Sequence, residues 1–208
     1  MNTSVIRPAI LLLLVMTLLT GIAYPLVITG IAKLAFGNAA EGSLLARDGK
    51  TVASRLIGQS FSDPKYFWSR PSATGPYPYN GTASSGSNQG PLNPALTDAV
   101  KQRIVTLQAA DPDNKQPVPV DLVTASASGL DPHISVAGAA YQAGRVARAR
   151  GLSAADVQKL VAEHIEKPTL GFLGESRVNV VELNLALDAA AHGQPAADTS
   201  GSGSAPPR

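Results

Sequence analysis

An uncharged, apolar stretch from Pro8 to Ala32 constrains this chain more than any other feature. It runs for 25 residues between Arg7 and Lys33. As a helix rising about 1.5 Å per residue it would be roughly 37 Å long, enough to cross a hydrocarbon core of roughly 30 Å. The sequence therefore predicts one transmembrane helix over residues 8–35, preceded by a short cytoplasmic tail, residues 1–7.

A cleaved secretory signal is the alternative interpretation of the same stretch. Leu11–Leu19 resembles a signal core, and Gly37-Asn38-Ala39 is an acceptable cleavage site. Signal cores are shorter, about 7–15 residues, so a retained anchor is favoured, and either interpretation exports the rest of the chain. Lys and Arg flank the helix on both sides, so their count does not decide orientation. The very short first tail favours a cytoplasmic N-terminus and an extracytoplasmic, periplasmic domain at a bacterial inner membrane.

Thr17, Gly21 and Pro25 are spaced four residues apart and would share one face of this helix. Small residues there let a second helix approach closely, so the three are candidate partner contacts. Pro25 would kink the helix or leave a carbonyl without a donor, which a neighbouring helix could cover. A lone anchor surrounded by membrane lipid is the alternative.

Composition excludes several classes of function and of site for the rest of the chain. The net charge of +2 is too small to indicate nucleic-acid binding, and the absence of cysteine excludes disulfides and thiolate metal sites. An exported domain without disulfides fits a bacterial envelope. Residues 36–192 suffice for one soluble domain, and residues 193–208, rich in Gly, Ser and Pro, predict a disordered tail.

Local patterns predict that the domain is of mixed α/β (α+β) type. Residues 36–42 have the composition of a linker, residues 50–59 follow an Asp48-Gly49 turn and favour a strand, and the prolines in 117–124 favour an edge strand. Residues 74–91 are too rich in Gly, Pro, Ser and Asn for a helix or a long strand. Capping residues and helical periodicity predict four helices, which follow Asn93, Ser135, Ser153 and Asn179.

Phosphate-binding motifs are weak. Gly49-Lys50-Thr51 lacks the glycine that a phosphate loop places five positions earlier, because Leu44 stands there. The Ser84–Gly90 segment could present backbone N–H groups to an anion. Its candidate ligands are Ser85, Gly86, Ser87, Asn88 and Gln89.

A hydrolase is disfavoured, although Ser126, Ser128, Asp131 and His133 lie close together in the sequence. Triad members usually come from distant segments, and no G-x-S-x-G elbow is present. The three histidines lack metal-ligand spacing. The residues therefore predict neither a catalytic group nor a metal site.

Three arginines, Arg145, Arg148 and Arg150, crowd the end of one predicted helix. They would either stabilise the free carbonyls at its C-terminus or form a basic contact patch. The sequence leaves both alternatives open.

Several longer motifs occur in order along the chain. They are LIGQSF at 56–61, YFWSRPSA at 66–73, YNGTASSGSNQGPLNP at 79–94, PVPVDLVTASASGLDPHIS at 117–135, RVARARGL at 145–152 and LGFLGESRVNVVELNLALD at 170–188. Together with the N-terminal helix, they resemble the family of C subunits of bacterial Kdp-type potassium-transporting ATPases. The resemblance covers nearly the whole chain before the tail.

The resemblance implies an accessory, non-catalytic subunit of a high-affinity, ATP-driven potassium uptake complex. Its implied partners are a channel-like potassium-binding subunit, a P-type ATPase subunit and a small hydrophobic subunit. It further implies a catalytic chaperone that raises the ATP affinity of the ATPase subunit, with ATP as a cofactor by family attribution alone. The chain has no Asp-Lys-Thr-Gly phosphorylation site, and one helix cannot build a selectivity filter. An external domain cannot reach cytoplasmic ATP, so the chaperone role conflicts with the predicted topology.

Candidate partner contacts in the domain are aromatic and polar residues of the irregular segment and the nearby acid–histidine pair. They are Tyr66, Arg70, Tyr77, Tyr79, Asn80, Asn88, Asn93, Asp131 and His133. Phe67 and Trp68 are either part of this surface or simply core. The alternative function is a free-standing, membrane-anchored envelope enzyme or binding protein.

Overall fold

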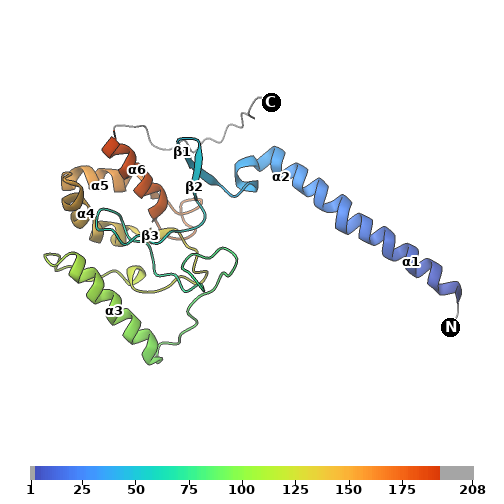
Figure 1. Cartoon of the computed structure of the whole chain (residues 1–208), viewed down its shortest axis with the longest axis horizontal. Helices are drawn as coiled ribbons and strands as arrows, with labels where there is room; N and C mark the ends of the chain where they lie inside the picture. The colour runs from blue at the N-terminus through green and yellow to red at the C-terminus, as the bar shows by residue number, and fades with distance from the viewer. Residues whose placement is uncertain (1–2, 193–208) are drawn as a thin grey trace. The chain divides into compact units, whose positions relative to one another are not determined.

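The computed structural model describes residues 3–192 (Figure 1). The chain divides into a helical unit, which ends at Leu44, and a compact domain, which begins at Leu45. The tail predicted to be disordered, residues 193–208, lies outside the described residues.

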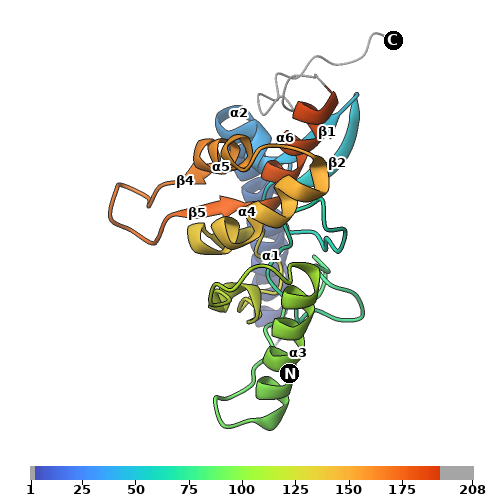
Figure 2. The ribbon, with the colours of Figure 1, turned by 90° about the vertical axis from the view of Figure 1, so that its left-hand side faces the viewer.

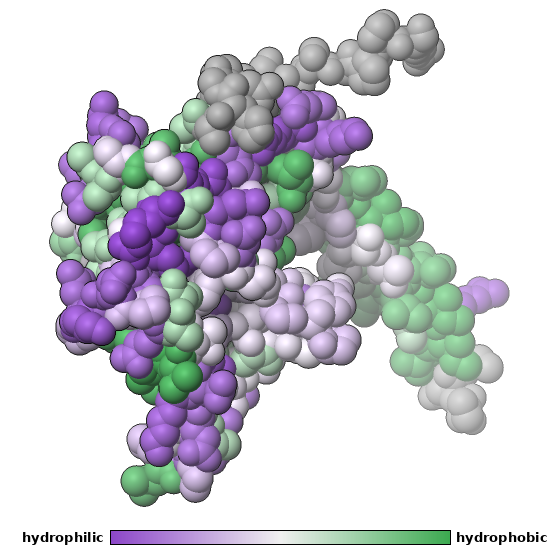
Figure 3. Space-filling view, turned by 60° about the vertical axis from the view of Figure 1, so that its left-hand side comes forward, coloured by the Kyte–Doolittle hydropathy of each residue, from purple (hydrophilic) through white to green (hydrophobic). Residues whose placement is uncertain are grey.

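One long helix makes up the N-terminal unit. It consists of α1 (Thr3–Leu18), a π-helical turn (Leu19–Ala23) and α2 (Tyr24–Ala40). An 18-residue window within Val5–Ala40 has a mean hydropathy of 2.4. The apolar side chains along this helix are exposed, and Figure 3 shows those on the face in view. Within the described residues it is the one helix long and apolar enough to cross a membrane, which confirms the predicted candidate span.

Pro25 accounts for the π turn. Proline has no N–H to donate, and its ring crowds the carbonyl four residues earlier. The turn before it is widened, so that the N–H of Tyr24 donates to the carbonyl of Leu19, five residues back. The helix therefore continues past Pro25, with one non-helical residue at Phe36 (φ −138°, ψ 38°). The linker expected over residues 36–42 is wrong for residues 36–40, because these belong to α2.

A two-stranded hairpin opens the domain. β1 (Leu44–Arg47) pairs with β2 (Lys50–Ser54), and the turn residues Asp48 and Gly49 have φ values of 52° and 72°. Positive φ at both central residues is typical of tight hairpins, since it matches the twist of the strands. The strand predicted over residues 50–59 is confirmed for Lys50–Ser54, whereas residues 55–59 do not continue it, and β1 was not predicted.

A small antiparallel sheet and three helices form the centre of the domain. The sheet order is β3 (His133–Ser135), β5 (Arg177–Asn179) and β4 (Ile165–Glu166). The helices are α4 (Val136–Arg150), α5 (Ala154–Glu163) and α6 (Val180–His192). Their predicted caps are confirmed, because Ser135, Ser153 and Asn179 each accept a backbone N–H of the first turn. The domain is thus of mixed helix and strand type.

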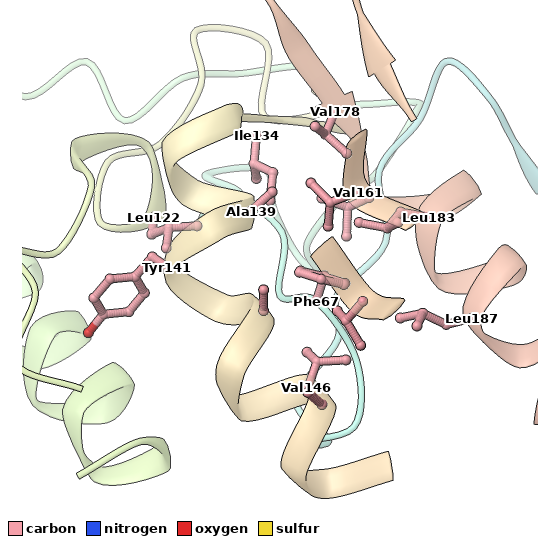
Figure 4. Packing of buried hydrophobic residues seen from close by; sticks show 14 of the residues in the cluster. Phe67, Leu122, Ile134, Ala139, Tyr141, Val146, Val161, Val178, Leu183 and Leu187 are labelled. Atoms are coloured by element: carbon pink, nitrogen blue, oxygen red, sulfur yellow. The ribbon is translucent and has the colours of Figure 1, made fainter. Parts of the chain in front are cut away.

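Aliphatic side chains from these elements converge on one core (Figure 4). Its fully buried members include Ile134, Val146, Val157, Val178, Val180, Leu183 and Leu187. Phe67, from the irregular segment after β2, is completely buried among them. The core therefore depends on a residue that belongs to no helix or strand.

Two buried amides attach that segment to the helices. The N–H and the carbonyl of Phe67 bond to Oδ1 and Nδ2 of Asn184, both at 2.9 Å. The N–H of Trp68 donates to Oε1 of Gln142 (2.8 Å), and Nε2 of Gln142 donates to the Trp68 carbonyl (3.1 Å). These amide clamps, Asn184 on α6 and Gln142 on α4, satisfy buried backbone groups as a neighbouring strand would.

The fourth helix, α3 (Pro94–Ala110), lies at the periphery of the domain (Figures 1 and 2). Its start is as predicted, with Oδ1 of Asn93 accepting from the N–H of Ala95 (3.0 Å). The predicted buried stripe is only partly buried: Leu107 is in the core, while Leu96, Val100 and Ile104 are half-buried.

The predicted edge strand over residues 117–124 is wrong. Val120–Leu122 form a short 3₁₀ turn instead. The side chain of Asp121 explains this conformation, because it accepts from the N–H (2.7 Å) and the hydroxyl (3.0 Å) of Ser135 at the start of α4. Side-chain bonding to a helix start competes here with a strand ladder.

Candidate functional site

Two glycine- and serine-rich loops, residues 72–91 and 125–132, pair with each other. Ser85 donates its N–H to the carbonyl of Ser128 (3.0 Å), and Oγ of Ser72 donates to the carbonyl of Gly129 (2.7 Å). Gly86 lies so close that a Cβ there would be 2.9 Å from the carbonyl oxygen of Ala127. The absence of side chains at this contact lets the two backbones approach.

A polar hub inside the first loop fixes its shape. Oγ of Ser72 accepts from the N–H of Tyr79 (2.9 Å), and Oγ1 of Thr74 accepts from the N–H of Asn80 (3.0 Å). The Tyr79 hydroxyl donates to the carbonyl of Arg70 (2.5 Å), and burial raises its pKa to about 12. Tyr79 and Asn80, both candidate partner contacts, therefore also hold the loop internally.

Other candidates in this loop point outward. The side chain of Tyr77 is 57% exposed, and Asn88 and Asn93 are exposed as well. Asn88 has a φ of 51°, the left-handed region that Asn tolerates better than most residues. Tyr77 and Asn88 are thus accessible to a partner, while Asn93 also caps α3.

Three further candidates, Arg70, Asp131 and His133, form a charged row beside these loops together with Glu166, which was not predicted. Nη1 of Arg70 is 3.2 Å from Oδ2 of Asp131, and Nδ1 of His133 is 3.0 Å from Oδ1 of Asp131. Nε2 of His133 lies 3.5 Å from Oε2 of Glu166. The row joins the irregular segment at Arg70 and the second loop at Asp131 to β3 and β4.

Hydrogen bonds and neighbouring charge keep both carboxylates ionised. Burial alone would raise the pKa of Asp131, but bonds from His133 and the charge of Arg70 hold it below the ordinary value of 3.8. Burial likewise opposes ionisation of Glu166, and the bond from Arg55 (2.9 Å) with the charge of His133 holds its pKa below 4.5. Arg177 adds a second cation 3.0 Å from Glu166.

This arrangement links the irregular segment to the small sheet through ion pairs and hydrogen bonds. Both ring nitrogens of His133 face carboxylates, and the hydroxyls of Ser126 and Ser128 accept from the N–H groups of Gly129 and Leu130. The hollow beside the row has a volume of about 310 Å³ and is lined mainly by charged and polar side chains. Among the described residues, no three His, Asp or Glu side chains are placed to hold a metal ion.

The three arginines at the end of α4 make internal contacts. Arg145 is buried, donates to the carbonyls of Pro64 and Tyr66, and lies 4.4 Å from the centre of the Trp68 ring. Burial lowers its pKa to about 10. Arg148 pairs with the buried Asp111.

Arg150 and Tyr66 share one acceptor on α6. Arg150 bonds Asp188 at 2.8 Å and lies 4.9 Å from the Tyr66 ring, and the Tyr66 hydroxyl donates to the same carboxylate (3.0 Å). Tyr66, a candidate partner contact, is therefore also part of the bracing between the irregular segment and the helices.

The anion candidates, Ser85 to Gln89, lie along the pairing of the two loops. Within this run, the N–H of Ser85 is used in that pairing, at the carbonyl of Ser128. In the helical unit, Thr17, Gly21 and Pro25 lie on the exposed surface, and a Cβ at Gly21 would be 4.0 Å from Cγ2 of Thr17. Both candidate sets stay predictions.

Sequence reasoning did not single out the amide clamps. Asn184 sits within an otherwise apolar helical face, and Gln142 lies one turn from Arg145 on the buried face of α4. A lone amide in a buried stripe is the available signal, because it must find hydrogen-bond partners.

An apolar helix that could span a membrane, followed by a mixed helix and strand domain, is typical of one class: membrane proteins with a single span and an extramembrane domain. The particular family follows from comparison. The chain belongs to the family described as K⁺-transporting ATPase, c chain, whose model matches residues 6–189.

Curated relatives match over most of the chain. Proteins named potassium-transporting ATPase KdpC subunit from Dechloromonas aromatica and Polaromonas naphthalenivorans are 64% and 66% identical, over 89% of this chain and 97% and 95% of theirs. The relative of the same name from Herpetosiphon aurantiacus is 59% identical over 88% of this chain and 94% of its own.

Proposed function

We propose that this chain is an accessory, non-catalytic subunit of an ATP-driven potassium uptake complex in a bacterial inner membrane. Family membership and the names of the relatives support potassium transport. The observation that carries the accessory role is that Asp131 and His133, the acid and the histidine considered above for a hydrolase, are engaged in bonds within the domain. Such a domain presents a fixed surface to partners.

The proposed partners are the channel-like subunit, the P-type ATPase subunit and the small hydrophobic subunit of the complex. The N-terminus is proposed to be cytoplasmic and the domain periplasmic, over the external mouth of the channel-like subunit. There the domain would stabilise that subunit or shape ion entry. The small residues Thr17 and Gly21 would contact a neighbouring helix within the membrane.

Recovery from native membranes tests the proposal. The full chain, solubilised in mild detergent, should bring larger membrane proteins with it, and its expression should rise on potassium starvation. The chain could instead purify as a stable monomer with an enzymatic or binding activity of its own. Loss of that activity in His133→Ala would favour the free-standing envelope enzyme or binding protein.

Crosslinking tests the proposed position of the domain. Probes at the exposed Tyr77 and Asn88 should form adducts with the outer face of the channel-like subunit. Adducts with cytoplasmic ATPase domains would contradict this position and favour the chaperone role.

ATP binding at Ser85–Gln89 stays a proposal from the family resemblance. Equilibrium dialysis of the full chain with labelled ATP measures it directly. Binding that is lost on replacing the 85–89 segment by alanines would support a nucleotide site. Binding unaffected by that replacement, or no binding, would remove this segment as the site.

A further inference from the structure

An exposed apolar surface lies in the loop between β4 and β5, which projects from the domain (Figure 2). We call residues 170–173 the apolar tip. The side chains of Leu170, Phe172 and Leu173 are 79%, 73% and 51% exposed. Exposed hydrophobic clusters of this kind usually mark interaction sites, whereas single exposed apolar residues need no explanation.

The backbone holds the apolar tip in one conformation. Thr169 and Leu173 exchange two hydrogen bonds, with N···O distances of 3.0 and 2.9 Å, and the N–H of Gly171 donates to the carbonyl of Pro168 (2.9 Å). Gly171 and Gly174 have φ values of 83° and 89°, a region that glycine adopts without steric cost. The tip is therefore preorganised, which lowers the entropy lost on binding.

The size of the tip limits what can cover it. Three side chains expose roughly 400 Å² at most, about half of the roughly 800 Å² per partner in a stable, independent interface. Contact through the tip alone would not hold together two proteins that diffuse freely in solution. A partner confined to the same membrane needs much less contact area, because tethering raises the effective concentration.

The charges at the base of the tip favour a protein over lipid. Lys167 and Glu175 are exposed, and neither has an ion pair within the described residues. The charges of Lys167 and Glu175 cancel, so this pair gives no net attraction to anionic headgroups, and the tip has none of the Trp or Tyr residues that anchor chains at membrane interfaces. A protein pocket can instead oppose each of the two charges with its complement.

We infer that the apolar tip docks into an apolar pocket on the extramembrane surface of a membrane-embedded partner subunit. The pocket carries an acidic group opposite Lys167 and a basic group opposite Glu175. This inference rests on the proposed function, because it names how the subunit attaches to its complex.

Photocrosslinking in the assembled complex tests the inference. Benzoylphenylalanine replaces Phe172 in the full chain, or Val120 as the control, since Val120 is a lone apolar residue that is 71% exposed elsewhere on the domain. We expect position 172, and not position 120, to give an adduct with a membrane protein that also co-purifies with the wild-type chain. Mass spectrometry should map the adduct to an apolar pocket.

Retention in the complex gives a second readout. F172S should lower recovery of the partner under stringent washing by about ten-fold relative to wild type, and V120S should leave it unchanged, since burial of one large apolar side chain is worth about one to two orders of magnitude. Unchanged urea midpoints for both variants show that the domain remains folded.

The other outcomes are distinguishable. Adducts from position 172 with lipid alone, no adduct from that position, or equal retention of both variants would overturn the docking inference while leaving the proposed function standing. Recovery of the wild-type chain without any partner would overturn the proposed function itself.

Discussion

Single polar side chains decide how the irregular segment is held. Asn184 bonds both backbone groups of Phe67, and Gln142 bonds both backbone groups of Trp68. Buried backbone groups without partners cost more than the net gain from forming the bond, so each clamp is worth more than its own two hydrogen bonds suggest.

Asn184→Leu should destabilise the chain by about 2–5 kcal/mol, because it leaves a buried N–H and a buried carbonyl of Phe67 unpaired. Urea unfolding of the detergent-solubilised chain, followed by fluorescence of its single tryptophan, measures the change. Gln102→Leu on the exposed face of α3 is the control and should change stability by less than about 0.5 kcal/mol. Equal effects of the two substitutions would contradict the clamp.

The charged row makes the stability of the folded chain decrease as the pH becomes acidic. The pKa of Asp131 is lower in the folded chain than its ordinary value of 3.8, so the unfolded chain binds protons first as the pH falls. Its stabilising contribution is present above pH 3.8 and is lost as the pH falls through the lower, folded value. Asp131→Asn should therefore flatten the acid limb of a stability–pH profile. Asp98→Asn, on the exposed surface of α3, should leave that limb as steep as in wild type.

At the scale of elements, local signals located the helices. Asn93, Ser135, Ser153 and Asn179 cap the helices that were predicted to follow them. The small sheet was missed, since β4 and β5 are two and three residues long and β5 also pairs with β3, which lies far away in the sequence. The edge strand predicted over residues 117–124 was wrong because β-branched composition carries no information about Ser135, which lies outside this segment and bonds Asp121.

The candidate site was predictable only as a set of residues. The sequence indicates that residues 74–91 form a loop with exposed aromatic and polar groups. It does not indicate that Asp131 would lie between Arg70 and His133, or that Glu166 would close the charged row. The contacts of Arg70 with Asp131 and of His133 with Glu166 join segments that are far apart in the chain, and spacing alone does not encode them.

The pairing of the two loops should tolerate no side chain at Gly129. Its φ is 68°, and a Cβ there would be 2.5 Å from the carbonyl oxygen of Ser85 and 2.6 Å from Cγ2 of Thr74. Gly129→Ala should destabilise the chain by about 2 kcal/mol or more, measured by urea unfolding. Gly90→Ala, where no atom lies within 4 Å, should be neutral or slightly stabilising. A neutral Gly129→Ala would mean that the loops separate easily.

At the scale of the whole molecule, the side of the membrane occupied by the domain can be measured directly. The chain has no cysteine, so a single introduced thiol is a unique label. With the domain periplasmic, Ser87→Cys in the exposed loop should react with a membrane-impermeant maleimide in cells with a permeabilised outer membrane. Arg7→Cys should react only after the inner membrane is opened. The reverse pattern would place the domain in the cytoplasm.

The amide clamps have a consequence for loop engineering. Because two side chains rather than an adjoining strand fix Phe67 and Trp68, no ladder runs onward from them into the chain that follows. The surroundings of Gly90 are open. An extra residue inserted beside Gly90 therefore shifts no strand register and leaves the rings of Phe67 and Trp68 in place. Epitope tags or reporter peptides grafted there should be accommodated as outward bulges of the surface.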